Sequence, residues 1–288
     1  MTLALTGATG HLGRLVLESL LARGVAPDDI VAIGRDTSKL ADFAERGVQL
    51  RTADYSKPET LAAAFEGVDR LLLISGSEVG QRVKQHGNVI DAAKDAGVGF
   101  IAYTSAPRAD TSDLVLAPEH KATEQLIRDS GIPFSFLRNG WYTENYVQVA
   151  QQAKHTGLII ASLGDGTVAS ASRKDFADAA AVVLAGPGHE NSVYELSGDT
   201  AWGYEELAQV VSDIVGREVT YKRVSSKEHR TILTKAGLPM GQAGFVVSLD
   251  TNTRDGALGL VTGDLARLIG RPTTPLAEGL AEAYAAAE

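Results

Sequence analysis

Short apolar runs alternate with segments of helical periodicity along the first half of the chain. The runs are rich in Val, Ile, Leu and Phe, as strands commonly are. They lie at residues 3–6, 29–34, 48–54, 69–75, 98–105 and 133–139. Each is followed by a stretch with apolar residues three and four positions apart, and most of these stretches end in glycine, as helices often do. Strands and helices that alternate over short connections predict an α/β fold.

The predicted strands are continuous apolar runs rather than alternations of apolar and polar residues. Such runs are typical of strands buried on both faces of a parallel sheet. We therefore predict a doubly wound parallel sheet of the Rossmann type, with helices on both faces.

The regular alternation ends near residue 157 of the 288 in the chain. Residues 1–157 are predicted to form a dinucleotide-binding domain, to which a further strand–helix unit at 191–215 returns. The stretches 158–190 and 216–288 are less regular. We expect them to form a smaller C-terminal substrate-binding lobe over the carboxyl edge of the sheet, where open α/β sheets bind ligands.

Gly7, Gly10 and Gly13 stand where the first strand gives way to the first helix. A tight turn, a close approach of backbone to a pyrophosphate and close helix–strand packing each favour glycine at such a junction. The spacing is G-x-x-G-x-x-G rather than the G-x-G-x-x-G of the common fingerprint. A flexible turn without a ligand is the alternative, but the position after the first strand favours dinucleotide binding, with the phosphates at the helix N-terminus.

Arg35 and Asp36 follow the second strand, where an NAD-binding protein usually has an acidic residue for the ribose 2′-hydroxyl. The Arg35 guanidinium suits a 2′-phosphate, and Lys39, in the first turn of the next helix, would add a second positive charge. Alternatively both cations are solvated, with Asp36 or Thr37 as a helix cap. The arrangement favours NADP over NAD.

The third and fourth predicted strands end in TADYS and LLISGS. Asp54 and Tyr55 are candidates to line the adenine, although Asp54 could instead cap a turn. The end of the fourth strand would border a cofactor ribose.

The composition of the chain argues against several classes of partner. The net charge of −9 argues against nucleic acid or an anionic membrane surface as the partner. The chain has no cysteine and its 6 histidines lack metal-ligand spacing, so no metal site is predicted. With no apolar run of membrane-spanning length and no signal-peptide pattern, we expect a cytoplasmic protein without a membrane partner.

Taken together, several stretches resemble the NmrA-like atypical short-chain dehydrogenase/reductases. The stretches are TGATGHLG, LLLISGSEVGQRVKQHGNVIDAAKDAGV, FIAYTS, LRNGWYTENY, GDGTVASASRKDFADAAA and HENSVYELSGD, with GLP and LIGRPTTPLAE in the C-terminal part. Within that group the chain is most similar to bacterial members that reduce quinones with NADPH and to the related triphenylmethane dye reductases.

The resemblance implies a role for individual positions. The pyrophosphate would be wrapped by the glycine turn and the helix start, comprising Gly7, Ala8, Thr9, Gly10, His11 and Leu12. Arg35 would hold the 2′-phosphate. The ribose would be followed by Ser75, Gly76 and Ser77, and Thr104 is assigned to the cofactor as well. The nicotinamide would be flanked by Arg138, Asn139, Gly140, Trp141, Tyr142 and Thr143. Residues 170–175 would border the substrate cleft, with Ser170 and Arg173 as candidate contacts.

Most short-chain dehydrogenases protonate a carbonyl oxygen with a Tyr-x-x-x-Lys pair, and this chain has none after AYTSA. His120 lies near the place of that pair and is a candidate acid, although a surface or hydrogen-bonding role suits a lone histidine better. A quinone needs little help from an acid, because its reduced product is an aromatic hydroquinone anion. Such chemistry would be carried by the cofactor while the protein orients the reactants.

Tyr142 and Tyr146 open the helix that follows the sixth strand. Tyr142 is a candidate catalytic residue and part of an apolar wall for a flat aromatic substrate; for Tyr146, core packing and the wall are equally good interpretations. The leading prediction is an NADPH-dependent reductase of quinones or similar conjugated acceptors, monomeric or homodimeric. The alternative is an NADP-sensing regulatory protein without turnover.

Overall fold

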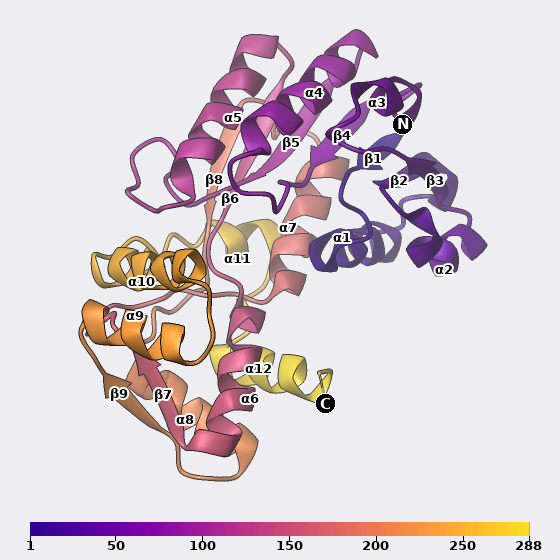
Figure 1. Ribbon diagram of the computed structural model, residues 1–288. Helices are drawn as coiled ribbons and strands as arrows, with labels where there is room; N and C mark the ends of the chain where they lie inside the picture. Colours follow the sequence, from indigo (N-terminus) through magenta and orange to yellow (C-terminus); the bar gives the residue numbers. More distant parts are fainter. Residues whose placement is uncertain (288) are drawn as a thin grey trace.

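The computed structural model describes residues 1–287, and its centre is a seven-stranded parallel sheet with the order β3-β2-β1-β4-β5-β6-β8 (Figure 1). The strands are β1 (Leu3–Leu5), β2 (Ile30–Gly34), β3 (Gln49–Thr52), β4 (Arg70–Leu73), β5 (Phe100–Ser105), β6 (Phe134–Asn139) and β8 (Ser192–Leu196). Every neighbouring pair is parallel. The doubly wound sheet predicted from the sequence is therefore confirmed.

The order of the strands reverses between β1 and β4. The chain builds β1, β2 and β3 outward in one direction and then β4, β5, β6 and β8 in the other. Next to such a reversal the connections leave the sheet in opposite directions and open a crevice at the carboxyl ends of the strands. This crevice is where the glycine turn lies.

Side chains alternate between two helical layers because successive residues of a strand point to opposite faces. Leu3 and Leu5 belong to the apolar core on one face, whereas Ala4 belongs to the core on the other. The first face is covered by α1 (His11–Ala22), α2 (Ala41–Glu45), α7 (Arg173–Ala185) and α11 (Asp264–Ile269). The second face is covered by α3 (Leu61–Ala64), α4 (Arg82–Asp95) and α5 (Ala117–Ser130).

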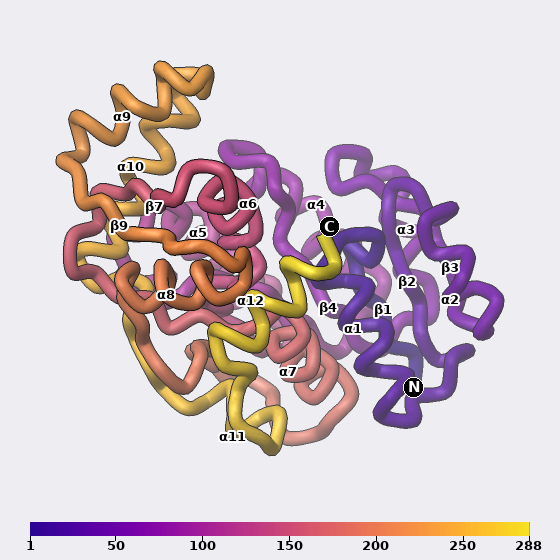
Figure 2. The backbone as a smooth tube through the Cα atoms, turned by 90° about the horizontal axis from the view of Figure 1, so that it is seen from below, coloured from indigo at the N-terminus to yellow at the C-terminus, as the bar shows by residue number. Residues whose placement is uncertain are grey.

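A smaller lobe continues from the carboxyl end of β6 and has its own apolar core (Figure 1). Its elements are α6 (Val147–Thr156), β7 (Leu158–Ala161), α8 (Tyr204–Val215), β9 (Thr220–Arg223), α9 (Ser226–Lys235), α10 (Met240–Arg254) and α12 (Leu276–Ala285). β7 pairs with β9 in a separate two-stranded parallel sheet. The α9–α10 pair projects from the outer end of the lobe (Figure 2). Short 3₁₀ turns complete the structure: η1 (Pro27–Asp29), η2 (Thr37–Leu40), η3 (Pro58–Thr60) and η4 (Thr143–Tyr146).

Two elements lie elsewhere than the sequence suggested. The unit at 191–215 divides, because β8 joins the main sheet beside β6 while α8 packs in the lobe, where Leu207 and Val211 are buried. Conversely, α11 falls within the stretch expected to form the lobe, but Leu265 is fully buried in the core beneath the first face of the sheet. In both cases the apolar face of the helix is covered by the region that it joins.

Residues 271–275 fasten the C-terminal segment to α7. The Arg271 guanidinium pairs with Asp175 at 2.7 Å and with Asp178 at 3.0 Å, and the Thr274 N–H donates to Asp175 Oδ2 at 2.8 Å. Asp175 is fully buried, so these partners balance its charge.

Within residues 1–287, no helix combines the length and the apolar character that crossing a membrane requires.

Candidate active site

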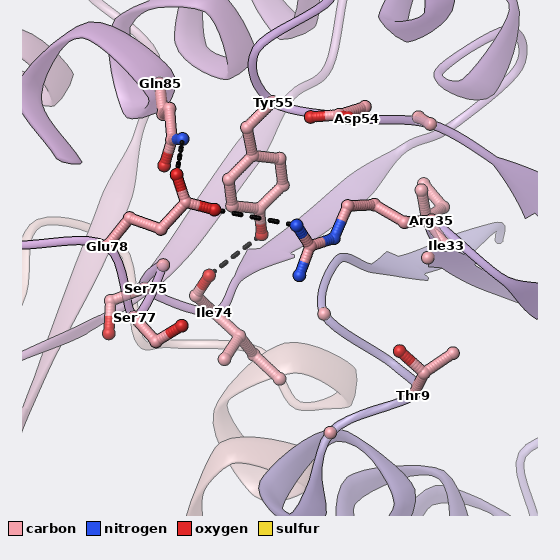
Figure 3. Close-up of a pocket in the computed structure, with 15 residues that line it drawn as sticks. Thr9, Ile33, Arg35, Asp54, Tyr55, Ile74, Ser75, Ser77, Glu78 and Gln85 are labelled. Atoms are coloured by element: carbon pink, nitrogen blue, oxygen red, sulfur yellow. Dashed lines mark hydrogen bonds and ion pairs between the residues drawn. The ribbon is translucent and has the colours of Figure 1, made fainter. Parts of the chain in front are cut away.

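A cavity of about 270 Å³ opens at the carboxyl ends of β1, β2 and β4. It is lined by Gly7, Thr9, Gly10, Ile33, Gly34, Arg35, Ala53, Asp54, Tyr55, Ile74, Ser75, Gly76, Ser77, Glu78 and Gln85 (Figure 3). The sequence predicted many of these residues, and the fold brings them together from segments far apart in the chain.

The three glycines of the turn have different structural roles. Gly7 has φ +63°, a left-handed conformation that side chains disfavour. A Cβ at Gly13 would lie 2.4 Å from the carbonyl oxygen of Gly7, so only glycine lets α1 pack this closely on the turn. Gly10 is the N-cap of α1, and no side chain caps the helix there.

The uncapped end of α1 suits a phosphate group. The first N–H groups of a helix lack internal acceptors and carry the positive end of the helix dipole. Ala8 and Leu12 have buried side chains, so they can serve a ligand only through their backbone, whereas the His11 side chain is exposed. The close approach at Gly13 and the open N-terminus at Gly10 therefore fit a dinucleotide pyrophosphate.

Arg35 lies at the mouth of the cavity, where its side chain is 71% exposed. Its Nη1 atom is 3.5 Å from Glu78 Oε1, and Glu78 Oε2 accepts a hydrogen bond of 3.0 Å from Gln85 Nε2 (Figure 3). Glu78 and Gln85 were not among the site residues predicted from the sequence. One feature of the sequence could have pointed to Glu78. It is an acidic residue in the loop after β4, and this loop lies at the same edge of the sheet as the end of β2, which Arg35 follows.

Asp54 and Tyr55 line the cavity and are also bonded to other groups of the protein, whereas Lys39 lies outside the cavity. Asp54 accepts from the Ser56 hydroxyl at 2.6 Å and N–H at 2.9 Å, and these bonds lower its pKa. The Tyr55 hydroxyl lies within hydrogen-bonding distance of Ile74 O, at 2.8 Å, and of Thr6 Oγ1. Burial raises the pKa of Tyr55, so the hydroxyl stays protonated. Lys39 is exposed and does not line the cavity, and its carbonyl accepts from Arg14 at 2.7 Å.

The Ser75–Gly76 backbone is held by side chains from both neighbouring elements. Thr104 Oγ1 accepts from the Ser75 N–H at 2.8 Å. His86 Nε2 accepts from the Gly76 N–H at 3.0 Å, and Arg82 Nε donates to the Gly76 carbonyl at 2.6 Å. Burial lowers the pKa of His86 to about 4, so the ring is neutral and keeps its acceptor nitrogen. Thr104 thus shapes the wall of the cavity through Ser75.

His120 is enclosed rather than presented to a substrate. Its side chain is buried, and Nδ1 lies 2.8 Å from the Tyr103 hydroxyl. Burial and the nearby Arg82 charge lower the pKa of His120 to about 3. The ring is therefore neutral near pH 7, and its place in the structure is that of a buried hydrogen-bonding group rather than the candidate acid.

Arg138 is also enclosed, by three carboxylates. Its guanidinium bonds both oxygens of Glu124 at 2.9 and 2.7 Å, and Nη1 lies 2.9 Å from Asp110 and 2.9 Å from Glu195. The side chain is 6% exposed. Because these partners come from three separate segments and occupy its donors, Arg138 joins parts of the fold instead of facing a nicotinamide.

Asn139 and Tyr142 retain hydrogen-bonding capacity at the carboxyl end of β6. Asn139 Nδ2 donates to the Tyr142 hydroxyl at 3.3 Å, and within residues 1–287 the buried Asn139 Oδ1 has no partner. Burial raises the pKa of Tyr142, whose ring packs edge-on against Phe176 at 5.2 Å between centroids. Gly140 lets β6 approach β8, because a Cβ there would lie 2.8 Å from the Leu196 carbonyl oxygen.

The remaining candidates are mainly used in packing. Trp141 packs on the core of the lobe, and Thr143 Oγ1 bonds Ser170 Oγ at 2.9 Å. Ser170 also accepts from Trp202 Nε1 at 3.1 Å, which leaves it buried and bonded. Tyr146 lies against Trp202 with ring centroids 5.0 Å apart. Of its two interpretations, packing in an apolar core therefore fits Tyr146 better than a place in the wall of a substrate site.

Arg173 remains partly exposed beside Tyr142. The centre of its guanidinium lies 5.2 Å from the centroid of the Tyr142 ring, and Nη2 donates to Asn145 Oδ1 at 3.3 Å.

Among residues 1–287 no three His, Asp or Glu side chains gather in a way that could hold a metal ion.

The glycine turn and cavity at the reversal of a parallel sheet define a dinucleotide-binding protein. The chain belongs to the NAD(P)H-binding family, which matches residues 7–187. It is 48% identical to quinone oxidoreductase 2 of Escherichia coli over 98% of each chain. The structure of that enzyme with NADPH superposes with a TM-score of 0.94 over 98% of this chain and 99% of the other.

Two further relatives resemble the chain over nearly its whole length. The Citrobacter sp. triphenylmethane reductase, solved with NADP(H), is 40% identical, with a TM-score of 0.92 over 98% of this chain and all (100%) of the other. An NAD(P)H azoreductase of Xenophilus azovorans is 31% identical over 98% of this chain and 97% of its own. The family resemblance noted in the sequence is confirmed.

Proposed function

We propose that the protein is an NADPH-dependent reductase that transfers a hydride to quinones or similar conjugated acceptors. The observation that carries the proposal is the cavity at the β1–α1 glycine turn with Arg35 at its mouth, in a chain 48% identical to a quinone oxidoreductase. The dye and azo compounds named for the other relatives are also conjugated electron acceptors.

Different residues would bind different parts of the cofactor. The N–H groups at the start of α1 would hold the pyrophosphate, and the Arg35 guanidinium would hold the 2′-phosphate. The Ser75–Ser77 backbone, fixed by Thr104 and His86, would border a ribose. When bound, NADPH supplies the hydride.

At the other end, the residues orient and exclude water. The Tyr142 ring, backed by the fully buried Phe176 ring, would give an apolar face beside Asn139, whose unpaired Oδ1 could accept from a carboxamide or a substrate hydroxyl. The Tyr142 hydroxyl accepts from Asn139, so its own proton can point to a substrate oxygen. Its raised pKa makes it a weak acid, which suits a substrate whose reduced form is a stable hydroquinone anion.

The test is direct transfer without a flavin. Purified, flavin-free protein is assayed with NADPH deuterated at each C4 face, using a benzoquinone and a simple ketone. We expect deuterium transfer, or a primary isotope effect, from one face with the quinone and slow reduction of the ketone. NADPH binding without turnover of any quinone would instead indicate an NADP sensor, and faster ketone reduction would reveal an acid elsewhere.

The proposal also includes the cellular compartment and the oligomeric state. A reductase of a diffusible acceptor that uses cellular NADPH would act in the cytoplasm, and the chain would be a monomer or a homodimer. Light scattering of the purified protein measures the second feature directly.

A further inference from the structure

We propose that Glu78 competes with the cofactor 2′-phosphate for Arg35 and thereby limits how strongly the protein prefers NADPH over NADH. This inference rests on the proposed function, because it takes the cavity to be the site for the adenosine end of the dinucleotide. It concerns the specificity of binding at that site rather than the reaction.

The first step is the place of Glu78. Its carboxylate extends across the mouth of the cavity and meets the Arg35 guanidinium, which comes from the end of β2 on the opposite side (Figure 3). Gln85, near the start of α4, holds the second carboxylate oxygen through its Nε2 atom at 3.0 Å. The negative charge is therefore held beside the guanidinium that should receive a phosphate.

The second step is the stiffness of the loop that carries Glu78. Both backbone groups of Gly76 are bonded by α4 side chains, the N–H to His86 and the carbonyl to Arg82. On the far side of Glu78, the Gly80 N–H donates to Glu119 Oε1 of α5 at 2.9 Å. Because the loop is held on both sides of Glu78, the carboxylate can leave Arg35 by rotation of its side chain but remains near the mouth.

The third step is the electrostatic consequence. A 2′-phosphate must displace Glu78 from Arg35 and then lie near a carboxylate of like charge. NADH carries a neutral hydroxyl at this position and meets neither obstacle. Removing the Glu78 charge should therefore strengthen NADPH binding while leaving NADH binding nearly unchanged.

The experiment measures dissociation constants by calorimetry for the full chain with NADPH and with NADH. Glu78→Gln removes the charge but keeps the shape of the side chain and one acceptor oxygen, which can still accept from Gln85. Because the Arg35–Glu78 pair is exposed and screened, we expect the NADPH constant to fall roughly threefold to tenfold. The NADH constant should stay within about twofold, and the gain for NADPH should shrink at high ionic strength.

Two controls separate this mechanism from others. Glu206→Gln removes the same charge from an exposed position on α8 in the lobe and should change neither constant. In an Arg35→Ala background, Glu78→Gln should strengthen NADPH binding less than it does in the wild type, since the competition is then absent.

The outcomes are distinct. Unchanged or weaker NADPH binding by Glu78→Gln would overturn the inference, and weaker binding of both cofactors would show that Glu78 accepts from a ribose hydroxyl. An equal gain with and without Arg35 would also overturn it. Wild-type protein that binds neither cofactor would instead overturn the proposed function.

Discussion

The two ends of the cofactor crevice use their polar groups differently. At the β1–β2 end, the glycine turn and Arg35 face an open cavity. At the β5–β6 end, His120 and Arg138 are already bonded to other residues of the protein, and among residues 1–287 the buried acceptors Asn139 Oδ1 and Glu144 Oε2 have no hydrogen-bond partner there. We therefore expect cofactor recognition to be concentrated at the first end, while the second end shapes the site for the acceptor.

The largest effect should come from opening the enclosed end. Arg138→Leu leaves the buried Glu124 carboxylate without its partner, which typically costs about 3–5 kcal/mol of the free energy of unfolding. The control Arg267→Leu removes an exposed ion pair with Asp264 and should cost under about 0.5 kcal/mol. Urea unfolding measures both. Equal stability of the two variants would show that the Arg138 cluster contributes little.

Acid should destabilise the whole fold, because each end of the crevice has a buried neutral histidine, His86 behind Gly76 and His120 against Tyr103. The pKa of His86 is about 4 and that of His120 about 3 in the folded protein, both below the ordinary 6.5. Between those values and pH 6.5 the unfolded chain binds more protons, so stability is complete above pH 6.5 and falls as the pH is lowered. We expect a loss of about 1 kcal/mol per pH unit or more below pH 6. Urea unfolding from pH 7 to pH 5 measures it, and His120→Phe should lessen the slope.

At the open end, the pyrophosphate position can be blocked. A Cβ at Gly10 would have only the Gly7 carbonyl oxygen within 4 Å, at 3.3 Å, so Gly10→Val should fold. Its side chain would project at the uncapped start of α1 and weaken NADPH binding by more than about 100-fold, or about 2.7 kcal/mol. Calorimetry and a thermal melt check the two statements together. Normal NADPH binding by this variant would move the phosphates elsewhere.

A smaller effect is expected from the 2′-phosphate contact. Arg35→Ala should weaken NADPH binding by about 1.5–3 kcal/mol, the range for hydrogen bonds to charged groups. NADH binding should be nearly unaffected, so the preference between cofactors would largely disappear. Titration of both cofactors into both proteins measures this, and equal NADPH affinity would contradict the assignment of Arg35.

The smallest effect should come from the proton supply. Tyr142→Phe and His120→Ala should each lower turnover of benzoquinones by less than about 100-fold, below the usual effect of removing a committed general acid. The reasons are the raised pKa of Tyr142 and the enclosure of His120. Steady-state kinetics with saturating NADPH test both variants. A larger loss in either, with unchanged cofactor binding, would identify an acid.

The sequence predicted what depends on local pattern. Continuous apolar runs indicated buried parallel strands, and the glycine spacing indicated a turn whose steric reasons the structure supplies at Gly7 and Gly13. Partners across long separations could not be predicted. Arg138 draws its carboxylates from positions 110, 124 and 195, and a charged residue near a strand end looks the same in sequence whether it meets a ligand or the protein. Glu78 was missed for the same reason, since its relation to Arg35 exists only across the folded cavity.

The position of α11 sets the order in which the chain can fold during synthesis. Leu265 completes the apolar core under the first face of the sheet, although β8, the last strand of that sheet, ends at Leu196. The ribosome adds roughly 5–20 residues per second, so the finished sheet waits several seconds with one face partly uncovered. Helices α8, α9 and α10 and strand β9 of the lobe are made during that interval. A chain stopped after β8 would therefore expose apolar surface that chaperones recognise, even though every strand of its sheet is present.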